Sequence, residues 1–485
     1  MKHFKVPLLL LTLAFLTTSC FNDLDDSQTA ASSINDFVWK GMNSWYNWQL
    51  QVPDLADTKD DDILAYDDYL KQFNDPRNLF NSLIYQDGIT DRFSWFVEDY
   101  IALQQQFQGI SKSFGLRFQS VQINANGDVI FYITYVAKNS PASAANMKRG
   151  DIINAINGTV LNAENYNAVA DDFANDTVTL SFVSENNGTL TPTENKTISS
   201  VILSDNPVHL AKVFENINGK KVGYLVYTGF RTAYNDELND VFSMFKNENI
   251  DELILDLRYN GGGAVETSSY LSSMIYADAG TGLFASLTFN EKHRNEDDTY
   301  SFSNTLKVYN TNDNETGQQT INRLNTLNRL YVLTSKSTAS ASEMVINGLK
   351  PYMNVKLVGT TTYGKNVGSV TLFDSPKTDF KSQQFANPTH SIAMQPIVFQ
   401  IFNKNGESDY TQGFSPDITV EEPQYWNNIL ELGDENEVVL KAALDDIRGI
   451  VSKTSLSKPK FYQALETKNL SKKFENEMYV ELNTK

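Results

Sequence analysis

The chain has 485 residues, with 40 basic and 59 acidic side chains and a formal net charge of −19. This excess of negative charge repels nucleic-acid phosphates, so nucleic-acid binding is not expected. The length predicts roughly three domains at ~150 residues each. After the N-terminal region, no apolar stretch is long enough to predict a membrane-spanning helix.

The first residues are typical of an export signal. A basic start precedes an apolar run from Val6 to Leu16, which is too short to span a bilayer but fits the centre of a signal peptide. Thr17–Cys20 comes next and ends in the only cysteine of the chain. The segment resembles a bacterial lipoprotein signal, which implies a signal peptide over residues 1–19 and a lipid attached to Cys20. An ordinary signal peptide with an incidental cysteine is the alternative.

Residues 20–33 are acidic and polar, and they predict a flexible tether. The tether is similar to the acidic export signals of Bacteroidetes-type lipoproteins. This resemblance implies a cell-envelope, outer-membrane lipoprotein that is exposed at the cell surface and anchored to the membrane through Cys20. A solvated linker with no sorting role explains the same residues.

Residues 34–108 predict a helical N-terminal domain. Aromatic residues crowd its first turns, and four of the five tryptophans fall in this region: Trp39, Trp45, Trp48 and Trp95. Such density is typical of the core of a small helical domain. A surface that contacts sugars or peptides is the alternative.

Residues 109–205 predict a β-rich domain. Apolar runs indicate strands at 113–118, 129–136 and 178–182. A short helical stretch is predicted from 163 to 173. With Arg-Gly-Asp-Ile-Ile at residues 149–153, this pattern resembles a PDZ domain, and a small β domain that only packs is the alternative.

The PDZ resemblance places a peptide-binding loop on Gly115, Leu116, Arg117 and Phe118. It implies that backbone amides of this loop bind the C-terminal carboxylate of a polypeptide. The bound peptide would add a strand to the edge of the sheet, so that affinity comes from main-chain hydrogen bonds.

Residues 206–425 alternate between predicted strands and helices, which indicates an α/β core. One strand, at 253–257, leads into Gly261, Gly262 and Gly263. Consecutive glycines let the backbone approach another group closely and expose its amides. No Gly-Lys-Ser/Thr follows them, so a phosphate-binding loop is disfavoured. Residues 426–485 predict a helical C-terminal segment.

Two further segments suggest nucleophilic chemistry. An apolar strand leads into Ser337–Glu343, and helical spacing begins at Ala341, so Ser340 is predicted at a helix N-terminus. A second strand leads into a loop that carries Lys365. A lysine whose pKa is lowered by burial accepts the proton of a serine hydroxyl. A Ser/Thr-rich segment that only caps a helix is the alternative.

These segments resemble those of the carboxyl-terminal processing peptidases, also called tail-specific proteases. The family has a Ser-Ala-Ser-Ala-Ser-Glu-type segment, a Phe/Tyr-Gly-Lys segment and an Asp-Leu-Arg-x-Asn-x-Gly-Gly strand end. The resemblance implies a crotonase- or ClpP-like core, with Ser340 as nucleophile, Lys365 as general base and oxyanion amides from Ala341 and Gly262. Glu343 is interpreted as structural. The implied activity is serine endopeptidase, without a cofactor, on envelope or extracellular polypeptides with free C-termini.

The sequence departs from the family pattern at two positions. Ser369 stands where members commonly carry a glutamine that orients the lysine, and Gly261 stands where proline is frequent. Ser369 is therefore predicted as a weaker base-orienting residue. The alternative function is a non-catalytic, peptide-binding surface lipoprotein with a degenerate peptidase domain.

Histidine and metal chemistry have little support in the sequence. His209, His293 and His390 are widely separated and lack the spacing of paired ligands, so no metal site is predicted. A Ser-His-Asp triad that uses one of them is an alternative to the lysine.

Overall fold

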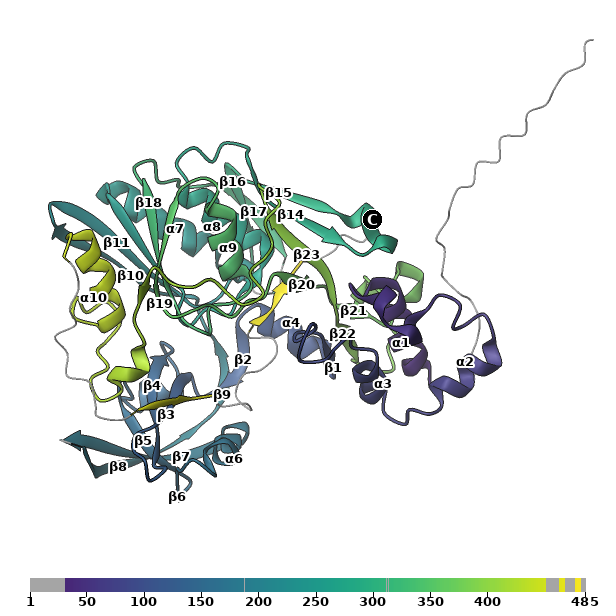
Figure 1. Cartoon of the computed structure of the whole chain (residues 1–485), viewed down its shortest axis with the longest axis horizontal. Helices are drawn as coiled ribbons and strands as arrows, with labels where there is room; N and C mark the ends of the chain where they lie inside the picture. The colour runs from purple at the N-terminus through teal and green to yellow at the C-terminus, as the bar shows by residue number, and fades with distance from the viewer. Residues whose placement is uncertain are drawn as a thin grey trace, which may run out of the picture.

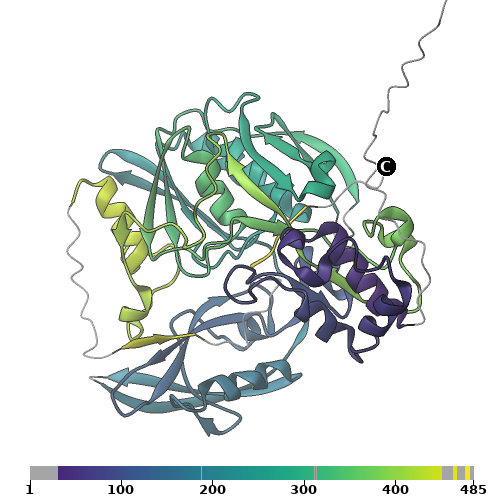
Figure 2. The ribbon, with the colours of Figure 1, turned by 45° about the vertical axis from the view of Figure 1, so that its right-hand side comes forward.

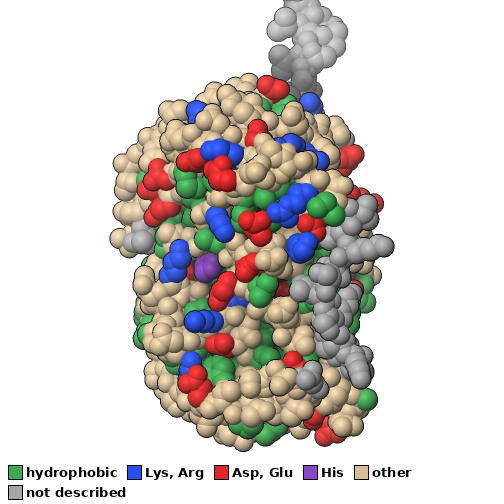
Figure 3. Space-filling view, turned by 90° about the vertical axis from the view of Figure 1, so that its left-hand side faces the viewer, with side chains coloured by type: hydrophobic (Ala, Val, Ile, Leu, Met, Phe, Trp, Pro, Cys, Tyr) green, Lys and Arg blue, Asp and Glu red, His purple; other side chains and the backbone are tan. Residues whose placement is uncertain are grey.

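The structure is a computed structural model that describes residues 31–186, 188–310, 312, 314–450, 462–466 and 476–480. The predicted signal peptide and the lipidation site, Cys20, lie outside these residues. Figure 1 shows a central α/β body with a β-rich unit below it and a helical unit beside it. Within the described part of the chain, no helix has the length and apolar character needed to span a bilayer. On the face in Figure 3, acidic and basic side chains are interspersed.

The helical unit confirms the prediction for the N-terminal region. Its elements are α1 (Ser33–Trp45), α2 (Ile63–Leu70), α3 (Pro76–Ser82), β1 (Trp95–Val97) and α4 (Tyr100–Phe107). The side chains of Asp62 and Asp99 accept hydrogen bonds from the first amides of α2 and α4, which is favourable N-capping. Trp39 and Trp45 are buried, so the aromatic cluster forms a core.

The β-rich unit spans residues 110–204 and has its own apolar core. Its strands are β2 (Ile110–Ser113), β3 (Leu116–Gln122), β4 (Val129–Val136), β5 (Ile152–Ile156), β6 (Thr159–Val160), β7 (Thr177–Asn186), β8 (Thr189–Ser199) and β9 (Val201–Ser204). Two short helices complete it, α5 (Pro141–Ala144) and α6 (Tyr166–Ala170). The strands predicted at 129–136 and 178–182 are therefore present. The stretch predicted at 113–118 is divided, because β2 ends at Ser113 and β3 begins at Leu116. The helix predicted from 163 to 173 begins later, as α6, and continues as a 3₁₀ helix over Asp171–Ala174.

The central body contains a six-stranded sheet that runs parallel from its second strand onward. In spatial order its strands are β10 (Val208–Ile217), β11 (Lys220–Tyr227), β12 (Glu252–Asp256), β18 (Arg329–Thr334), β19 (Asn354–Gly359) and β24 (Ile418–Thr419). Helices cover both faces: α7 (Asn235–Glu248), α8 (Val265–Ile275) and α9 (Ala341–Leu349) on one, and α10 (Val438–Ile447) on the other. Alternate residues of β12 explain this, because Leu253 and Leu255 face α7–α9 while Ile254 faces α10. The α/β prediction is confirmed.

A second six-stranded sheet brings distant segments together beside the first. Its order is β13 (Gly263–Ala264), β26 (Met478–Tyr479), β20 (Val367–Ser369), β23 (Ile397–Asn403), β14 (Leu283–Phe289) and β15 (Asp298–Ser301). Smaller strands complete the fold. In one three-stranded sheet, β22 (Ala393–Gln395) lies between β1 and β21 (Leu372–Phe373), and β16 (Thr305–Tyr309) forms a hairpin with β17 (Glu315–Thr320).

The predicted helical character of residues 426–485 is only partly correct. The structure describes α10, but it also describes two strands in this stretch, β25 (Gln463–Leu465) and β26. Both strands pair with distant parts of the chain, β25 with β3 and β26 with β13 and β20. The prediction was wrong for these residues because local spacing carries no information about such partners. Figures 1 and 2 show β26 at the centre of the molecule.

A buried charge cluster fixes the β-rich unit against the central body. Arg149 of the β-rich unit donates hydrogen bonds to Glu422 and to the Tyr259 hydroxyl. Arg258, at the end of β12, donates to Glu422, to Glu437 and to Asp256. Removing one partner of such a buried cluster leaves an unpaired charge, which typically costs about 3–5 kcal/mol. The two units are therefore held in one arrangement.

Candidate active site

Ser340 lies at the turn between β18 and α9, as predicted. Its φ is 64° and its ψ is −119°, a backbone conformation that costs a non-glycine residue roughly 1–3 kcal/mol. A strained strand-to-helix turn of this kind presents a nucleophilic serine in other hydrolases. Ser340 is 0% exposed, and among the residues the structure describes its Oγ has no hydrogen-bond partner. The hydroxyl is therefore buried and free of hydrogen bonds to the described residues.

Glu343 joins the serine turn to the lysine loop. Its Oε2 accepts from the backbone amides of both Ser340, at 3.0 Å, and Lys365, at 2.8 Å. Its Oε1 accepts from the Thr362 hydroxyl at 2.5 Å and from the Gly364 amide at 2.8 Å. Burial raises the pKa of Glu343 to about 7, and these four hydrogen bonds oppose the rise. Glu343 therefore has a structural role, as predicted: it positions the serine turn and the lysine loop at once.

Replacing Glu343 by glutamine is expected to lower the free energy of unfolding by about 2–4 kcal/mol. The glutamine –NH₂ group would face two of the four donors, and each buried donor left without an acceptor costs ~1–3 kcal/mol. Peptidase activity should fall with it, because the serine and lysine segments lose their shared support. Denaturant unfolding measures the effect, and Glu248→Gln, on the exposed surface of α7, is the matched control. Equal unfolding free energies for the two variants would contradict this role.

Lys365 is buried, with 1% of its surface exposed. Its Nζ donates to the carbonyl oxygen of Asn476 at 2.9 Å and to the carboxylate of Glu477 at 3.4 Å. Burial lowers the pKa of Lys365 and raises the pKa of Glu477, so both groups shift towards their neutral forms. Within the described residues no hydrogen bond joins this Nζ to Ser340 Oγ.

Ser369 contacts the lysine only through an intermediary. Its Oγ donates to the Glu477 carboxylate and, at 3.3 Å, to the Met478 carbonyl. The carboxylate of Glu477 therefore contacts both Ser369 and Lys365, and the base-orienting role predicted for Ser369 would act through this carboxylate. Glu477 and Asn476 were missed because they are 112 and 111 residues from Lys365, and no motif marks them.

The glycine run lies directly against Ser340. A Cβ built on Gly262 would be 2.6 Å from the Cβ of Ser340 and 3.1 Å from the amide nitrogen of Ala341. Only glycine fits there, and the φ of Gly262 is +120°. The Gly262 amide donates to Asn260 Oδ1 at 2.9 Å in this structure. The two predicted oxyanion donors, Ala341 and Gly262, are thus brought together beside the serine.

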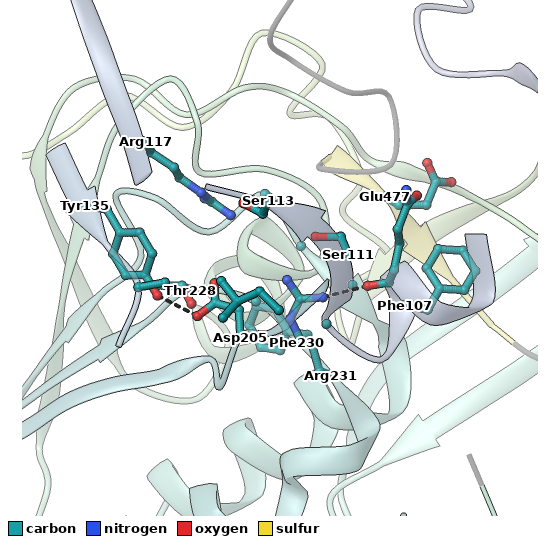
Figure 4. Close-up of a pocket in the computed structure, with 18 of the residues that line it drawn as sticks. Phe107, Ser111, Ser113, Arg117, Tyr135, Asp205, Thr228, Phe230, Arg231 and Glu477 are labelled. Atoms are coloured by element: carbon teal, nitrogen blue, oxygen red, sulfur yellow. Dashed lines mark hydrogen bonds between the residues drawn. The ribbon is translucent and has the colours of Figure 1, made fainter. Parts of the chain in front are cut away.

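A cavity of about 140 Å³ connects the predicted carboxylate loop with this region (Figure 4). Gly115, Leu116 and Arg117 line it, and so do the three glycines and Glu477. Figure 4 shows Arg117 and Glu477 on opposite sides of the cavity. Phe118 does not line it, because its ring stacks on Phe131 in the core of the β-rich unit.

The histidines do not contact Ser340 in the described part of the chain. His293 stacks on Trp45 and hydrogen-bonds the Ser44 hydroxyl, and burial lowers its pKa to about 3. His390 hydrogen-bonds Asp374, and burial lowers the pKa of His209 to about 4. The structure therefore offers no histidine as the base for Ser340.

Comparison with known proteins identifies the family of the chain. Residues 33–95 match the model of the Peptidase S41 N-terminal domain, and residues 221–420 match that of Peptidase family S41. A probable CtpA-like serine protease of Staphylococcus aureus (strain MRSA252) is 24% identical over 425 residues, covering 85% of this chain and 75% of that protein. The crystal structure of a candidate S41 protease from Bacteroides fragilis NCTC 9343 superposes with a TM-score of 0.65 at 27% identity, covering 88% of this chain and 99% of that one. The chain belongs to peptidase family S41 and is a CtpA-like serine peptidase.

Proposed function

We propose that this protein is a serine endopeptidase that works through a dyad of Ser340 and Lys365. The observation that carries the proposal is the single oxygen of Glu343 that accepts from the amides of both residues. This contact holds an unpartnered hydroxyl and a lysine of lowered pKa in one buried place. A neutral amine close to an uncommitted alcohol is what activation of a serine nucleophile requires.

In the proposed reaction, Ser340 Oγ forms a bond to the scissile carbonyl carbon while its proton passes to Lys365 Nζ. The lysine then gives that proton to the leaving amine, and the C–N bond breaks to leave an ester on Ser340. In the second step water attacks the ester carbon and gives a proton to Lys365. The C–O bond to Ser340 then breaks, the lysine returns the proton to Ser340 Oγ, and the acyl group leaves as a carboxylic acid. The amides of Ala341 and Gly262 would stabilise the oxyanion, which requires Gly262 to exchange Asn260 for the substrate.

The β-rich unit is proposed to be a PDZ domain attached to a crotonase- or ClpP-like core, with residues 109–205 and 206–425 as the two domains. Its loop at Gly115–Arg117 would bind the C-terminal carboxylate of a polypeptide. The cavity between this loop and the glycines beside Ser340 supports the pairing, because it gives a path between the two. Tethering one end of a substrate raises the effective concentration of the rest at the nucleophile. Envelope or extracellular polypeptides are the proposed substrates, with the lipid anchor at Cys20 holding the enzyme at the outer membrane.

A non-catalytic peptide-binding protein is the second candidate. Two observations favour it: Lys365 Nζ is bound to Asn476 and Glu477, and Ser369 replaces the usual glutamine. Both observations have another explanation if the C-terminal residues are themselves a displaceable ligand, as argued below.

The pH dependence of hydrolysis tests the lysine base. Only the neutral amine accepts a proton, and burial lowers the pKa of Lys365 from 10.5. We therefore expect kcat/KM for an unstructured polypeptide to rise with pH through this lowered pKa and to level off above it. Circular dichroism over the same pH range verifies that the fold persists. A flat profile in folded protein would rule out Lys365 as the base.

A further inference from the structure

The segment Asn476–Val480 contributes a strand to the second sheet. This strand lies between β13, which begins at the last of the three glycines, and β20, which follows Lys365. Its strand, β26, pairs in parallel with β13, where Met478 is opposite Gly263 and Tyr479 is opposite Ala264. On its other edge Tyr479 is opposite Ser369 of β20, again in parallel. The Gly263 amide donates to the Glu477 carbonyl at 2.7 Å. The glycine run and the strand that follows Lys365 are thus bridged by residues 476–480.

The side chains of this segment fill the space beside the nucleophile. The carboxylate of Glu477 contacts both Lys365 and Ser369, so the hydrogen bonds of the amine go to the C-terminal segment and not to Ser340. Met478 is 0% exposed, and the Tyr479 ring stacks on Phe107 with centroids 3.9 Å apart. Ser340 and Lys365 are both buried in this arrangement. An extended peptide held by main-chain pairing on both edges, with side chains in pockets, is the geometry of strand addition.

A second part of the same C-terminal region uses the edge of the β-rich unit. Strand β25 pairs antiparallel with the outer strand β3, with Gln463 opposite Gln122 and Leu465 opposite Ser120. The Gln119 side chain also donates to the Leu465 carbonyl at 2.9 Å. Because β25 runs against β3, it runs towards the loop that precedes β3, which is the proposed carboxylate-binding loop. Its direction and its edge are those expected of a bound polypeptide end.

We infer that residues 462–466 and 476–480 form an intramolecular ligand that occupies both peptide-binding edges and keeps the peptidase closed. This inference rests on the proposed roles of Ser340 and Lys365. A polypeptide substrate displaces the segment, and Lys365 Nζ then turns from Asn476 and Glu477 to the serine. The segment also indicates what the slot between β13 and β20 accepts: an extended peptide with an acidic residue opposite Lys365, followed by large apolar and aromatic residues.

The first test releases the segment in the full-length chain. The double variant Glu477→Ala/Tyr479→Ala removes the carboxylate that contacts Lys365 and the ring that stacks on Phe107, and it leaves the main chain of the segment intact. A tethered competitor acts at a concentration in the millimolar range, so weakening it should raise kcat/KM for an unstructured polypeptide at least about tenfold. Glu248→Ala, on the exposed surface of α7, is the control and should leave the rate unchanged. Circular dichroism and thermal unfolding confirm that each variant is folded.

The second test measures binding without catalysis. In a Ser340→Ala background, a fluorescein-labelled peptide Asn-Glu-Met-Tyr-Val should bind the Glu477→Ala/Tyr479→Ala chain at least about tenfold more tightly than the chain with its native segment, by fluorescence anisotropy. A peptide Asn-Lys-Met-Ala-Val, which reverses the charge and removes the aromatic ring, should bind more weakly to both.

The two tests separate this inference from the peptidase proposal. Tighter peptide binding after release, with no hydrolysis by any variant, supports the intramolecular ligand and overturns the catalytic role. Equal peptide affinity for the two chains overturns the intramolecular ligand, whatever the hydrolysis rate. A folded double variant with lowered activity also overturns it, because β26 would then be a fixed part of the active site.

Discussion

Replacing Ser340 by alanine is expected to lower kcat for polypeptide hydrolysis by roughly 10⁴-fold or more, because loss of a serine nucleophile removes the covalent pathway. The fold should not change. The Ser340 Oγ makes no hydrogen bond to the described residues, so its removal breaks none, and the free energy of unfolding should stay within about 0.5 kcal/mol. Steady-state hydrolysis and denaturant unfolding of the same preparations measure both effects.

The matched control for this substitution is Ser337→Ala. Ser337 lies on the same loop as Ser340, but it is exposed whereas Ser340 is buried. Its alanine variant should hydrolyse substrate at the parental rate. Comparable hydrolysis by Ser340→Ala and by the parent would show that another residue is the nucleophile.

Replacing Lys365 by methionine is expected to lower kcat by about 10³-fold, within the usual contribution of a positioned general base. Methionine keeps the apolar stem in its buried site and removes only the amine. The residual rate should also lose its rise with pH, since the group whose lowered pKa sets that rise is gone. Rates measured across the neutral and alkaline range test both points.

Lys377→Met serves as the control for this variant, because Lys377 is exposed on the 3₁₀ helix Pro376–Thr378 that follows β21. It should keep both the parental rate and the parental pH profile. A Lys365→Met enzyme that retains the pH-dependent rise would place the titrating group elsewhere.

Sequence predicted those parts of the fold and site that depend on neighbouring residues. The strand before Ser340, the helix from Ala341 and the glycines after β12 each follow from local apolar spacing and from residue type. The glycines indicated a close approach of the backbone to some group, and the resemblance to the carboxyl-terminal processing peptidases named Ser340 as that group; the structure leaves no room for a Cβ on Gly262 there. The resemblance of the three motifs to those of the carboxyl-terminal processing peptidases was sufficient to assign these segments to one site.

Contacts between distant residues could not be predicted in this way. The shared acceptor role of Glu343 depends on the loop at Lys365 folding back over the start of α9, although the Ser-x-x-Glu spacing is a capping-box signal. The strand character of Met478–Tyr479 depends on two free strand edges that meet only in the folded chain. Short strands take their stability from such partners, so the residues themselves gave no local indication.

The most direct measurement of the central claim is covalent labelling of the nucleophile. The full-length protein and the Glu477→Ala/Tyr479→Ala variant are treated with a fluorophosphonate, digested and examined by mass spectrometry. We predict one adduct, on Ser340, which forms faster in the variant and at higher pH and is lost when Lys365 is replaced by methionine. An adduct on a different serine, or no adduct in the folded variant, would contradict the account.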